Sequence, residues 1–336
     1  MEDSPRFQME KARTILRRSI YTFLQNYQYF TATAAIIAFP YAASVLVSQL
    51  FVPYSPLLPT IHNRLRLLFQ AAGFPSSSEF FTVLCFKISQ TISSSIFALP
   101  FTLSCLLLAK SSIIQLLNNH HKQNQPPSFS SVISLYNPLL ATYICNFLVL
   151  LSANATAFSL LFFGFDFFQG LGFTSSNWVL FLSASGAVLY SIILANALII
   201  CNLALVSSGM EKSGGYLAIL KACVLIRGKT STALTLAVPV NLVLAAVEAL
   251  FHYRIVRAFN SAEITSFPMA LEGVLIAYLY SIFVVLDTVV SCLFFKSCKQ
   301  GSSMEQQEEA RYSYRIEIAE EDGNAYVKVK NIEQLP

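Results

Sequence analysis

Three charged side chains stand more than one helical turn inside stretches of the sequence that are otherwise almost entirely apolar. They are Lys87, Glu248 and Asp287. A charge in the hydrocarbon of a bilayer is costly unless it is paired or faces a water-filled path, so each is a candidate functional residue. The chemistry open to such groups is ion pairing, recognition of a charged solute, or gating by protonation.

The depths of these residues restrict what they can do together. At a rise of about 1.5 Å per residue, Glu248 and Asp287 are about 15 Å apart along the membrane normal, which excludes a two-carboxylate acid–base site. Lys87 lies near the level of Glu248, which predicts an ion pair. Asp287 shares its level with Asn196, and Asn146 is close. Such a cluster is more commonly interhelical hydrogen bonding than a protonatable gate, and both interpretations stay open.

The elements that must position these residues are transmembrane helices. The chain is 55% apolar and 12% charged, about half the charge of a soluble domain. Six stretches are long enough to cross a bilayer, at residues 29–51, 82–108, 133–163, 178–206, 231–253 and 270–295. The predicted fold class is an all-α integral membrane protein, a bundle of about six transmembrane helices.

Lysine and arginine predict the orientation of this bundle. Seventeen of the 22 fall in the terminal segments and in the loops after the second and fourth spans, and four fall in the other loops. Lys110 is assigned to the loop after the second span. The positive-inside rule then places both termini in the cytosol. The predicted organisation is a cytosolic segment at 1–28, a transmembrane domain at 29–296 and a cytosolic tail at 297–336.

Three prolines fall near the middle of spans, and they predict helix kinks. They are Pro40, Pro100 and Pro239. Proline removes a backbone donor, so three kinks at one depth would loosen carbonyls around a central cavity, as in transporters with broken helices. The alternative is the ordinary tolerance of membrane helices for proline.

Two amphipathic segments lie outside the spans. Residues 6–24 predict a basic helix on an anionic leaflet, or else a plain extension of the first span. A second helix, at 215–227, is expected along the cytosolic surface, with Gly228 as its stop. The motif around it consists of Glu211, Gly215, Lys221, Arg227, Gly228 and Lys229.

This motif and the six-helix layout resemble a group of poorly characterised membrane proteins. An acidic residue, a glycine, an amphipathic helix and a basic-Gly-basic turn precede a new span. The pattern is similar to plant six-helix transmembrane proteins of unknown function, and to the membrane domain attached to some bacterial glycerophosphodiester phosphodiesterases. The resemblance implies no catalytic residues, and the chain has no room for the phosphodiesterase domain.

The tail after the sixth span changes character. Residues 311–318 alternate between apolar and polar, Asp322-Gly323 is a turn signal, and 326–330 alternate again. This predicts a short β-hairpin at 311–330 that docks a cytosolic protein. The alternative is a disordered tail.

The remaining function classes can be narrowed. The sequence has no G-x-S-x-G, H-E-x-x-H or P-loop motif, so we expect no enzyme activity, no cofactor and no metal. The basic residues follow the membrane edge, so nucleic acid is not an expected partner.

We expect a non-catalytic membrane organiser or adaptor in the endoplasmic reticulum or plasma membrane. The alternative is a transporter or channel-like carrier that uses the kinked helices with Asn146, Asn196 and Asp287. The sequence leaves the oligomeric state open.

Overall fold

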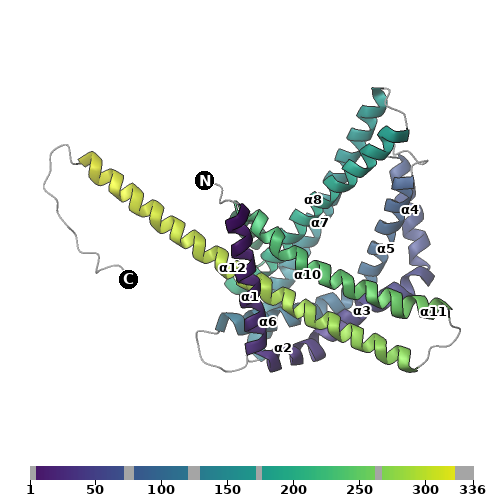
Figure 1. Ribbon diagram of the computed structural model, residues 1–336, viewed down its shortest axis with the longest axis horizontal. Coiled ribbons are helices and arrows are strands. Elements are labelled where there is room, and N and C mark those ends of the chain that lie inside the picture. The colour runs from purple at the N-terminus through teal and green to yellow at the C-terminus, as the bar shows by residue number, and fades with distance from the viewer. Residues whose placement is uncertain (1–4, 72–78, 120–128, 172–175, 262–266, 322–336) are drawn as a thin grey trace. The chain divides into compact units, whose positions relative to one another are not determined.

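The computed structural model describes residues 5–71, 79–119, 129–171, 176–261 and 267–321 (Figure 1). Within these ranges all regular structure is helical. The elements are α1 (Pro5–Gln25), α2 (Tyr27–Thr33), η1 (Ala34–Ala38), α3 (Phe39–Phe51), η2 (Val52–Tyr54), α4 (Leu57–Ala71), α5 (Glu79–Phe101), η3 (Thr102–Leu106), α6 (Leu107–Asn119), α7 (Phe129–Gly170), α8 (Ser176–Glu211), α9 (Tyr216–Ile226), α10 (Thr230–Phe251), η4 (His252–Val256), α11 (Arg257–Ser261) and α12 (Phe267–Glu321). The turns η1, η3 and η4 are π-helical, and η2 is a 3₁₀ turn.

Six helical segments in the described ranges are long and apolar enough to cross a membrane. They are Tyr27–Tyr54, Thr82–Asn118, Ser130–Phe168, Phe181–Glu211, Thr230–Phe259 and Phe267–Gly301. Each overlaps one of the six predicted spans. A helix satisfies its backbone hydrogen bonds internally, which hydrocarbon demands. The chain is therefore a multi-pass integral membrane protein built from helices.

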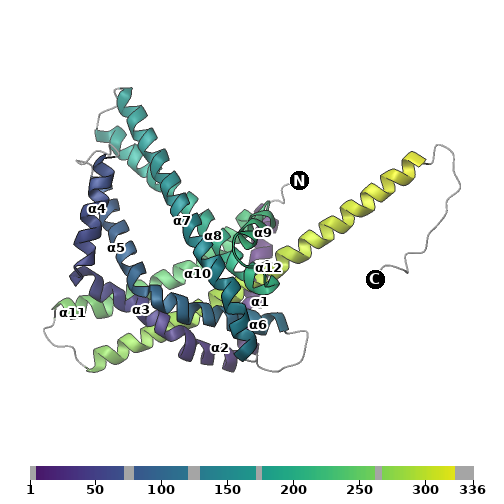
Figure 2. The ribbon, with the colours of Figure 1, turned by 180° about the vertical axis from the view of Figure 1, so that it is seen from behind.

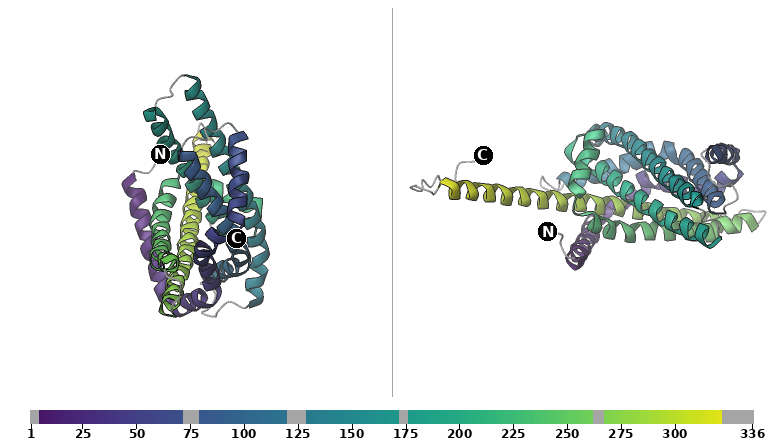
Figure 3. Two further views of the ribbon diagram at one scale, coloured as in Figure 1. Left: turned by 90° about the vertical axis from the view of Figure 1, so that its right-hand side faces the viewer. Right: turned by 90° about the horizontal axis from the view of Figure 1, so that it is seen from above.

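The chain divides into two compact units, Met1–Phe295 and Lys296–Pro336. In the first unit α7 runs beside α8, and α4 folds back along α5 (Figure 2). Helix α1 packs against α10 (Figure 3). A buried apolar cluster joins α3, α10, η4 and the first part of α12 through Leu46, Phe251, Ile255 and Ile276.

Three alanines spaced four residues apart in the first span lie at a close helix contact. Ala34, Ala38 and Ala42 are all completely buried. Ala42 belongs to the cluster that joins α3 to α12. Small side chains let helix backbones approach closely in a membrane, where dispersion contacts replace the hydrophobic effect as the driving force.

The predicted β-hairpin was wrong over residues 311–321, because these residues continue α12 to Glu321. The remaining hairpin residues, 322–330, lie outside the described residues. Alternation of apolar and polar residues was weaker evidence than continuity with a helix already formed. Extending a nucleated helix adds one hydrogen bond per residue, whereas an isolated two-stranded hairpin is marginal.

The three predicted kink prolines differ in their local structure. Pro40 follows the π-helical turn η1, and Pro100 precedes the π-helical turn η3. At Pro40 the wider turn lies on the N-terminal side, where the proline ring would otherwise clash with the preceding turn, whereas at Pro100 the wider turn follows the proline. Pro239 lies in α10, which is α-helical throughout. A fourth proline, Pro138 in α7, was not predicted to matter, and hydroxyls of Thr142 and Ser208 donate to its carbonyl at 2.7 and 2.9 Å.

The assignment of Lys110 to a cytosolic loop was wrong. Helix α6 continues to Asn119, and Lys110 is only 9% exposed. The predicted second span ended too early because a lysine and two serines lower the local hydropathy. Their burial against other helices removes that penalty, which a sequence average cannot include. The remaining bias of lysine and arginine is still sixteen to four.

Candidate functional site

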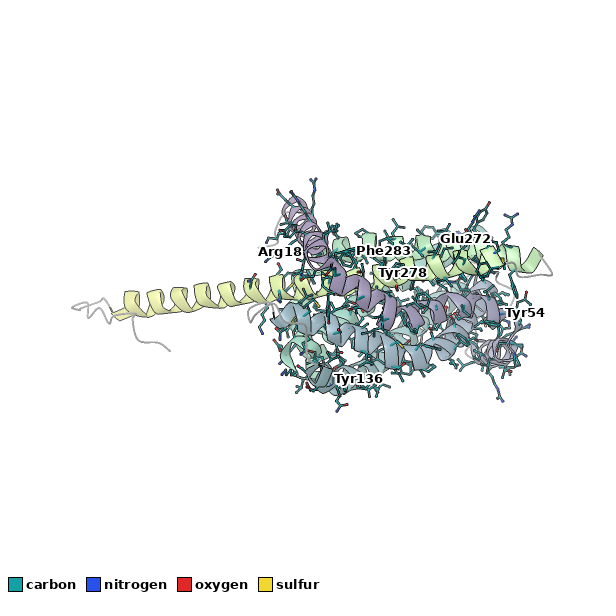
Figure 4. All side chains as sticks on the ribbon, turned by 90° about the horizontal axis from the view of Figure 1, so that it is seen from below. Arg18, Tyr54, Tyr136, Glu272, Tyr278 and Phe283 are labelled. Atoms are coloured by element: carbon teal, nitrogen blue, oxygen red, sulfur yellow. The ribbon has the colours of Figure 1, made fainter. Side chains whose placement is uncertain are left out.

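A cavity of about 930 Å³ lies within the first unit. Residues of α3, α5, η3, α6, α10, η4 and α12 line it, with contributions from α7 and α8. One end is formed near Gln49, Lys87 and His252, and the other near Lys110 and Asp287. We call these the His252 end and the Lys110 end. Figure 4 shows Tyr54 and Glu272 at one end of the unit, with Arg18 toward the other.

The two ends of the cavity differ in exposure. Lys87 and His252 are exposed, whereas Lys110 is buried. Near the His252 end, Arg254 of η4 pairs with Glu272 of α12 at 2.6 Å. This ion pair is itself solvent-exposed and holds η4 to α12. Exposed lining residues are therefore found at the His252 end, and the buried lysine is at the other end.

One face of α5 supplies four of the hydroxyl and amide side chains that line the cavity, together with a lysine. Lys87, Gln90, Thr91, Ser94 and Ser95 all line the cavity. Their spacing of i, i+3, i+4, i+7 and i+8 is that of a single helix face. Ser94 also hydrogen-bonds to a serine of α3. A polar face this long within a membrane helix requires water, solute or protein partners along its length.

Glu248 also lines the cavity, and its predicted ion pair with Lys87 is not formed among the described residues. The hydroxyl of Tyr280 instead donates to Oε1 of Glu248 at 2.9 Å. Tyr41 lines the cavity beside them and interacts electrostatically with Glu248. Equal depth was therefore insufficient to predict a pair, because Lys87 and Glu248 share the cavity wall without sharing a contact.

The Lys110 end brings together a cation and an anion from α6 and α12. Lys110 and Asp287 both line the cavity and interact electrostatically. They form no direct ion pair in the described part of the chain, and neither takes part in a hydrogen bond there. Asn202 of α8 lies at the same end. The Lys110 end therefore offers hydrogen-bond donors, from Lys110, and acceptors, from Asp287, to a molecule in the cavity.

Asn146 and Asn196, which were predicted to surround Asp287, lie elsewhere. Asn146 is buried between α7 and α8, where its amide donates to the carbonyl of Cys201 at 2.8 Å. Asn196 is exposed and donates to the carbonyl of Ile192 within its own helix. The asparagine that lines both cavities together with Asp287 is Asn202. Depth alone could not predict this, because rotation about the helix axis decides which residue faces inward.

A second, smaller cavity lies beside Asn202 and Asp287. It has a volume of about 530 Å³ and lies among α8, α10 and α12. Asn202 and Asp287 line both cavities, and most other lining residues of the second are aliphatic. The Lys110 end is therefore bordered by an apolar space on the far side of Asp287.

The motif after the fourth span forms a fixed connection among three helices. The ammonium of Lys221 in α9 pairs with Glu211 at the end of α8 at 2.8 Å. The backbone N–H of Gly215 donates to Oγ1 of Thr142 in α7 at 2.9 Å. A Cβ on Gly214 would come within 2.7 Å of the Pro138 backbone. The predicted helix at 215–227 is present as Tyr216–Ile226, and its place at a membrane surface stays a prediction.

Gly228 ends α9 as the sequence predicts, with φ of +77°. Arg227 donates its N–H to Val224, and Lys229 donates to Ile226. Replacement of Gly228 by alanine is expected to lower the free energy of unfolding by about 1 kcal/mol, because a β-carbon disfavours this conformation. Chemical denaturation in detergent measures the change. Gly228→Asn is the matched control, since asparagine tolerates this region, and equal stability of the alanine and asparagine variants would contradict the explanation.

The sequence contained a signal for the cavity that hydropathy alone does not reveal. The polar residues of α5 recur with helical periodicity inside an apolar stretch, and a helical-wheel analysis of that span would have found them. No comparable signal marks Lys110 as a partner of Asp287. In the described ranges no group of three or more metal-ligating side chains converges.

One of the comparisons with known proteins covers nearly the whole chain. The model of one family, described as Domain of unknown function (DUF8558), matches residues 3–331. The chain belongs to this family. No curated protein and no solved structure matches it. The family description gives no activity, and the resemblance to plant six-helix proteins and to the phosphodiesterase-linked membrane domain stays a prediction.

Proposed function

We propose that this member of the DUF8558 family is a non-catalytic carrier that binds a small polar solute in the cavity and moves it across the membrane. The observation that carries this proposal is the cavity itself, which places two cations and two anions among membrane-spanning helices. Ionisable residues that face an aqueous cavity at membrane depth are typical of solute pathways. The π-helical turns beside Pro40 and Pro100 provide bends in two of the helices that line it.

The carrier now takes precedence over the organiser expected first from the sequence. A sealed apolar bundle would have favoured the organiser, and the cavity weighs against it. The docking hairpin on which the organiser partly rested is replaced by helix over residues 311–321. Exposed apolar side chains on α9, such as Leu217 and Val224, support contact of that helix with lipid. Such contact suits a carrier as well as an organiser.

Orientation is part of the same proposal. Both termini lie in the cytosol, with the basic segments against the anionic leaflet. The His252 end of the cavity then faces the outer or lumenal side, because η4 follows the fifth span. Fusion of a pH-sensitive fluorescent protein to each terminus in turn tests this. Both fusions should respond only to cytosolic pH, and a response of either one to external pH would contradict the orientation.

Access of water to the α5 face can be measured by cysteine substitution. Ser94→Cys and Thr91→Cys are expected to react with a membrane-impermeant thiosulfonate reagent in intact membranes, because both positions line the cavity. Ile92→Cys and Ile96→Cys are the matched controls on the same helix, where the side chains are exposed away from the cavity. They should react at least tenfold more slowly, as expected of lipid-facing thiols. Equal rates at all four positions would show that no aqueous cavity exists.

Transport itself is tested in proteoliposomes. The purified full-length protein is reconstituted, and uptake is followed for labelled amino acids, sugars, organic acids and nucleosides. At least one class should enter faster than into empty liposomes, and Asp287→Asn should reduce that uptake by about tenfold or more. Asp166→Asn is the control, because Asp166 is exposed and lies outside the cavity. Uptake no faster than in empty liposomes for every solute, from a preparation whose cavity cysteines still react, would contradict the carrier proposal.

A further inference from the structure

The Lys110 end has the features of a recognition site for a ligand with two opposite charges. Lys110 is buried, with an exposed fraction of only 9%, and it lines the cavity. Asp287 lines the same end from the facing helix and attracts Lys110 electrostatically. The opposite charges of the two groups attract each other, yet the groups form no direct ion pair in the described ranges.

Buried charges that form no direct ion pair require other partners. A buried charge is tolerated when it is paired and its hydrogen-bonding capacity is filled. Lys110 has three N–H donors and Asp287 has four lone-pair sites, and no described residue hydrogen-bonds to either. Glu248 is different, since one of its oxygens already accepts from Tyr280. The unfilled capacity is therefore concentrated at Lys110 and Asp287.

The sign of the charges excludes a simple ion as the best ligand. A cation attracted to Asp287 is repelled by Lys110, and an anion attracted to Lys110 is repelled by Asp287. A molecule with one positive and one negative group satisfies both at once and leaves the site neutral. The hydroxyls of Tyr41 and Tyr143, which also line the cavity, can complete the hydrogen bonds of such a ligand.

We propose that the cavity binds a small zwitterion of the amino-acid type, with its carboxylate at Lys110 and its ammonium at Asp287. This deepens the proposed function and rests on it for the direction of movement, although binding can be measured without transport. The solute enters from the His252 end, where the exposed Lys87 and the polar face of α5 provide successive hydrogen-bonding partners. Binding at the Lys110 end replaces the missing ion pair by two ligand-mediated ones.

Matched ligands that lack one charge test the assignment. Purified full-length protein in mild detergent is titrated by scintillation proximity or calorimetry with alanine and phenylalanine. Propionate and phenylpropionate keep only the carboxylate, while ethylamine and phenylethylamine keep only the amine. At least one amino acid should bind about tenfold more tightly than both of its singly charged analogues, equivalent to about 1.4 kcal/mol. Equal affinity for a singly charged analogue, or binding of neither amino acid, would overturn the zwitterion proposal.

Substitutions locate the two contacts. Lys110→Met should remove the preference for the amino acid over the amine, and Asp287→Asn should remove the preference for the amino acid over the carboxylate. The charge-exchanged variant K110D/D287K keeps the site neutral and should retain the zwitterion preference. Lys221→Met is the control outside the cavity and should bind like the wild type. Each variant is first checked for a monodisperse size-exclusion profile, and an unchanged preference in folded K110M would overturn the assignment.

The outcomes also separate this inference from the proposed function. Zwitterion binding without uptake in proteoliposomes would refute the carrier and keep the binding site. Uptake of a singly charged or uncharged solute, with no amino-acid binding, would keep the carrier and refute the zwitterion assignment.

Discussion

Replacement of Gly214 by alanine is expected to destabilise the protein more than the same change at any other glycine whose surroundings the structure describes. The new Cβ would lie 2.7 Å from Cα and 2.8 Å from the carbonyl oxygen of Pro138. Both are backbone atoms of α7, so no side chain can rotate away. The expected loss lies at or above the upper end of the roughly 1–3 kcal/mol typical of overpacking. Displacement of the loop also weakens the Gly215–Thr142 hydrogen bond.

Thermal unfolding in detergent, followed by fluorescence-detected size exclusion, measures this effect. Gly164→Ala is the control, because Gly164 lies in the interior of α7 and a Cβ there meets nothing within 4 Å. Alanine is also the better helix former, so the control should be neutral or slightly stabilising. Similar unfolding temperatures for the two variants would show that the loop after α8 is not held against α7.

Removal of one charge at the Lys110 end is expected to destabilise the protein, while removal of both is not. Lys110→Met leaves Asp287 in the cavity wall without its cation, and Asp287→Asn does the reverse. Breaking a buried pair in direct contact costs about 3–5 kcal/mol, and the looser arrangement here is expected to cost about 2–3 kcal/mol. The double variant K110M/D287N removes both charges and should recover most of that loss.

A double-mutant cycle in denaturant gives the coupling energy directly. We expect a coupling of about 3–5 kcal/mol between Lys110 and Asp287, because two single losses of about 2–3 kcal/mol each would largely disappear in the double variant. The pair Lys221 and Glu211 provides a surface comparison, since both are partly exposed and exposed pairs contribute about 0–1 kcal/mol. Additive single effects at Lys110 and Asp287 would mean that the two charges are independently solvated.

The sequence predicted those parts of the fold that depend on residues near one another in the chain. Each of the six spans corresponds to a helical segment, because about twenty apolar residues can satisfy their backbone in lipid only as a helix. The end of α9 at Gly228 was predicted for a similar reason, since glycine there adopts a positive φ. These are local rules that tertiary packing did not override.

The contacts of the candidate site were predicted less well. Lys87 and Glu248 line the cavity without a bond between them, and Asn146 donates to the carbonyl of Cys201. Asp287 lines the cavity with Asn202 and interacts electrostatically with Lys110. The sequence estimates only the depth of each group along the membrane normal. Contact also requires the rotation of each helix and the identity of its neighbours, and a single sequence contains neither.

The turn η3 has a consequence for the angular register of the helix that contains it. A regular α-helix advances about 100° per residue, so over the stretch from Thr91 to Lys110 it would place Lys110 about 100° around the axis from Thr91. A π-helical turn accommodates one additional residue without advancing that angle. With η3 in place the two side chains come back into phase, and both line the same cavity. The one additional residue in η3, next to Pro100, therefore rotates Lys110 of α6 toward the cavity. Lys110 then lies on the same side of the helix as the cavity-lining hydroxyl groups of α5.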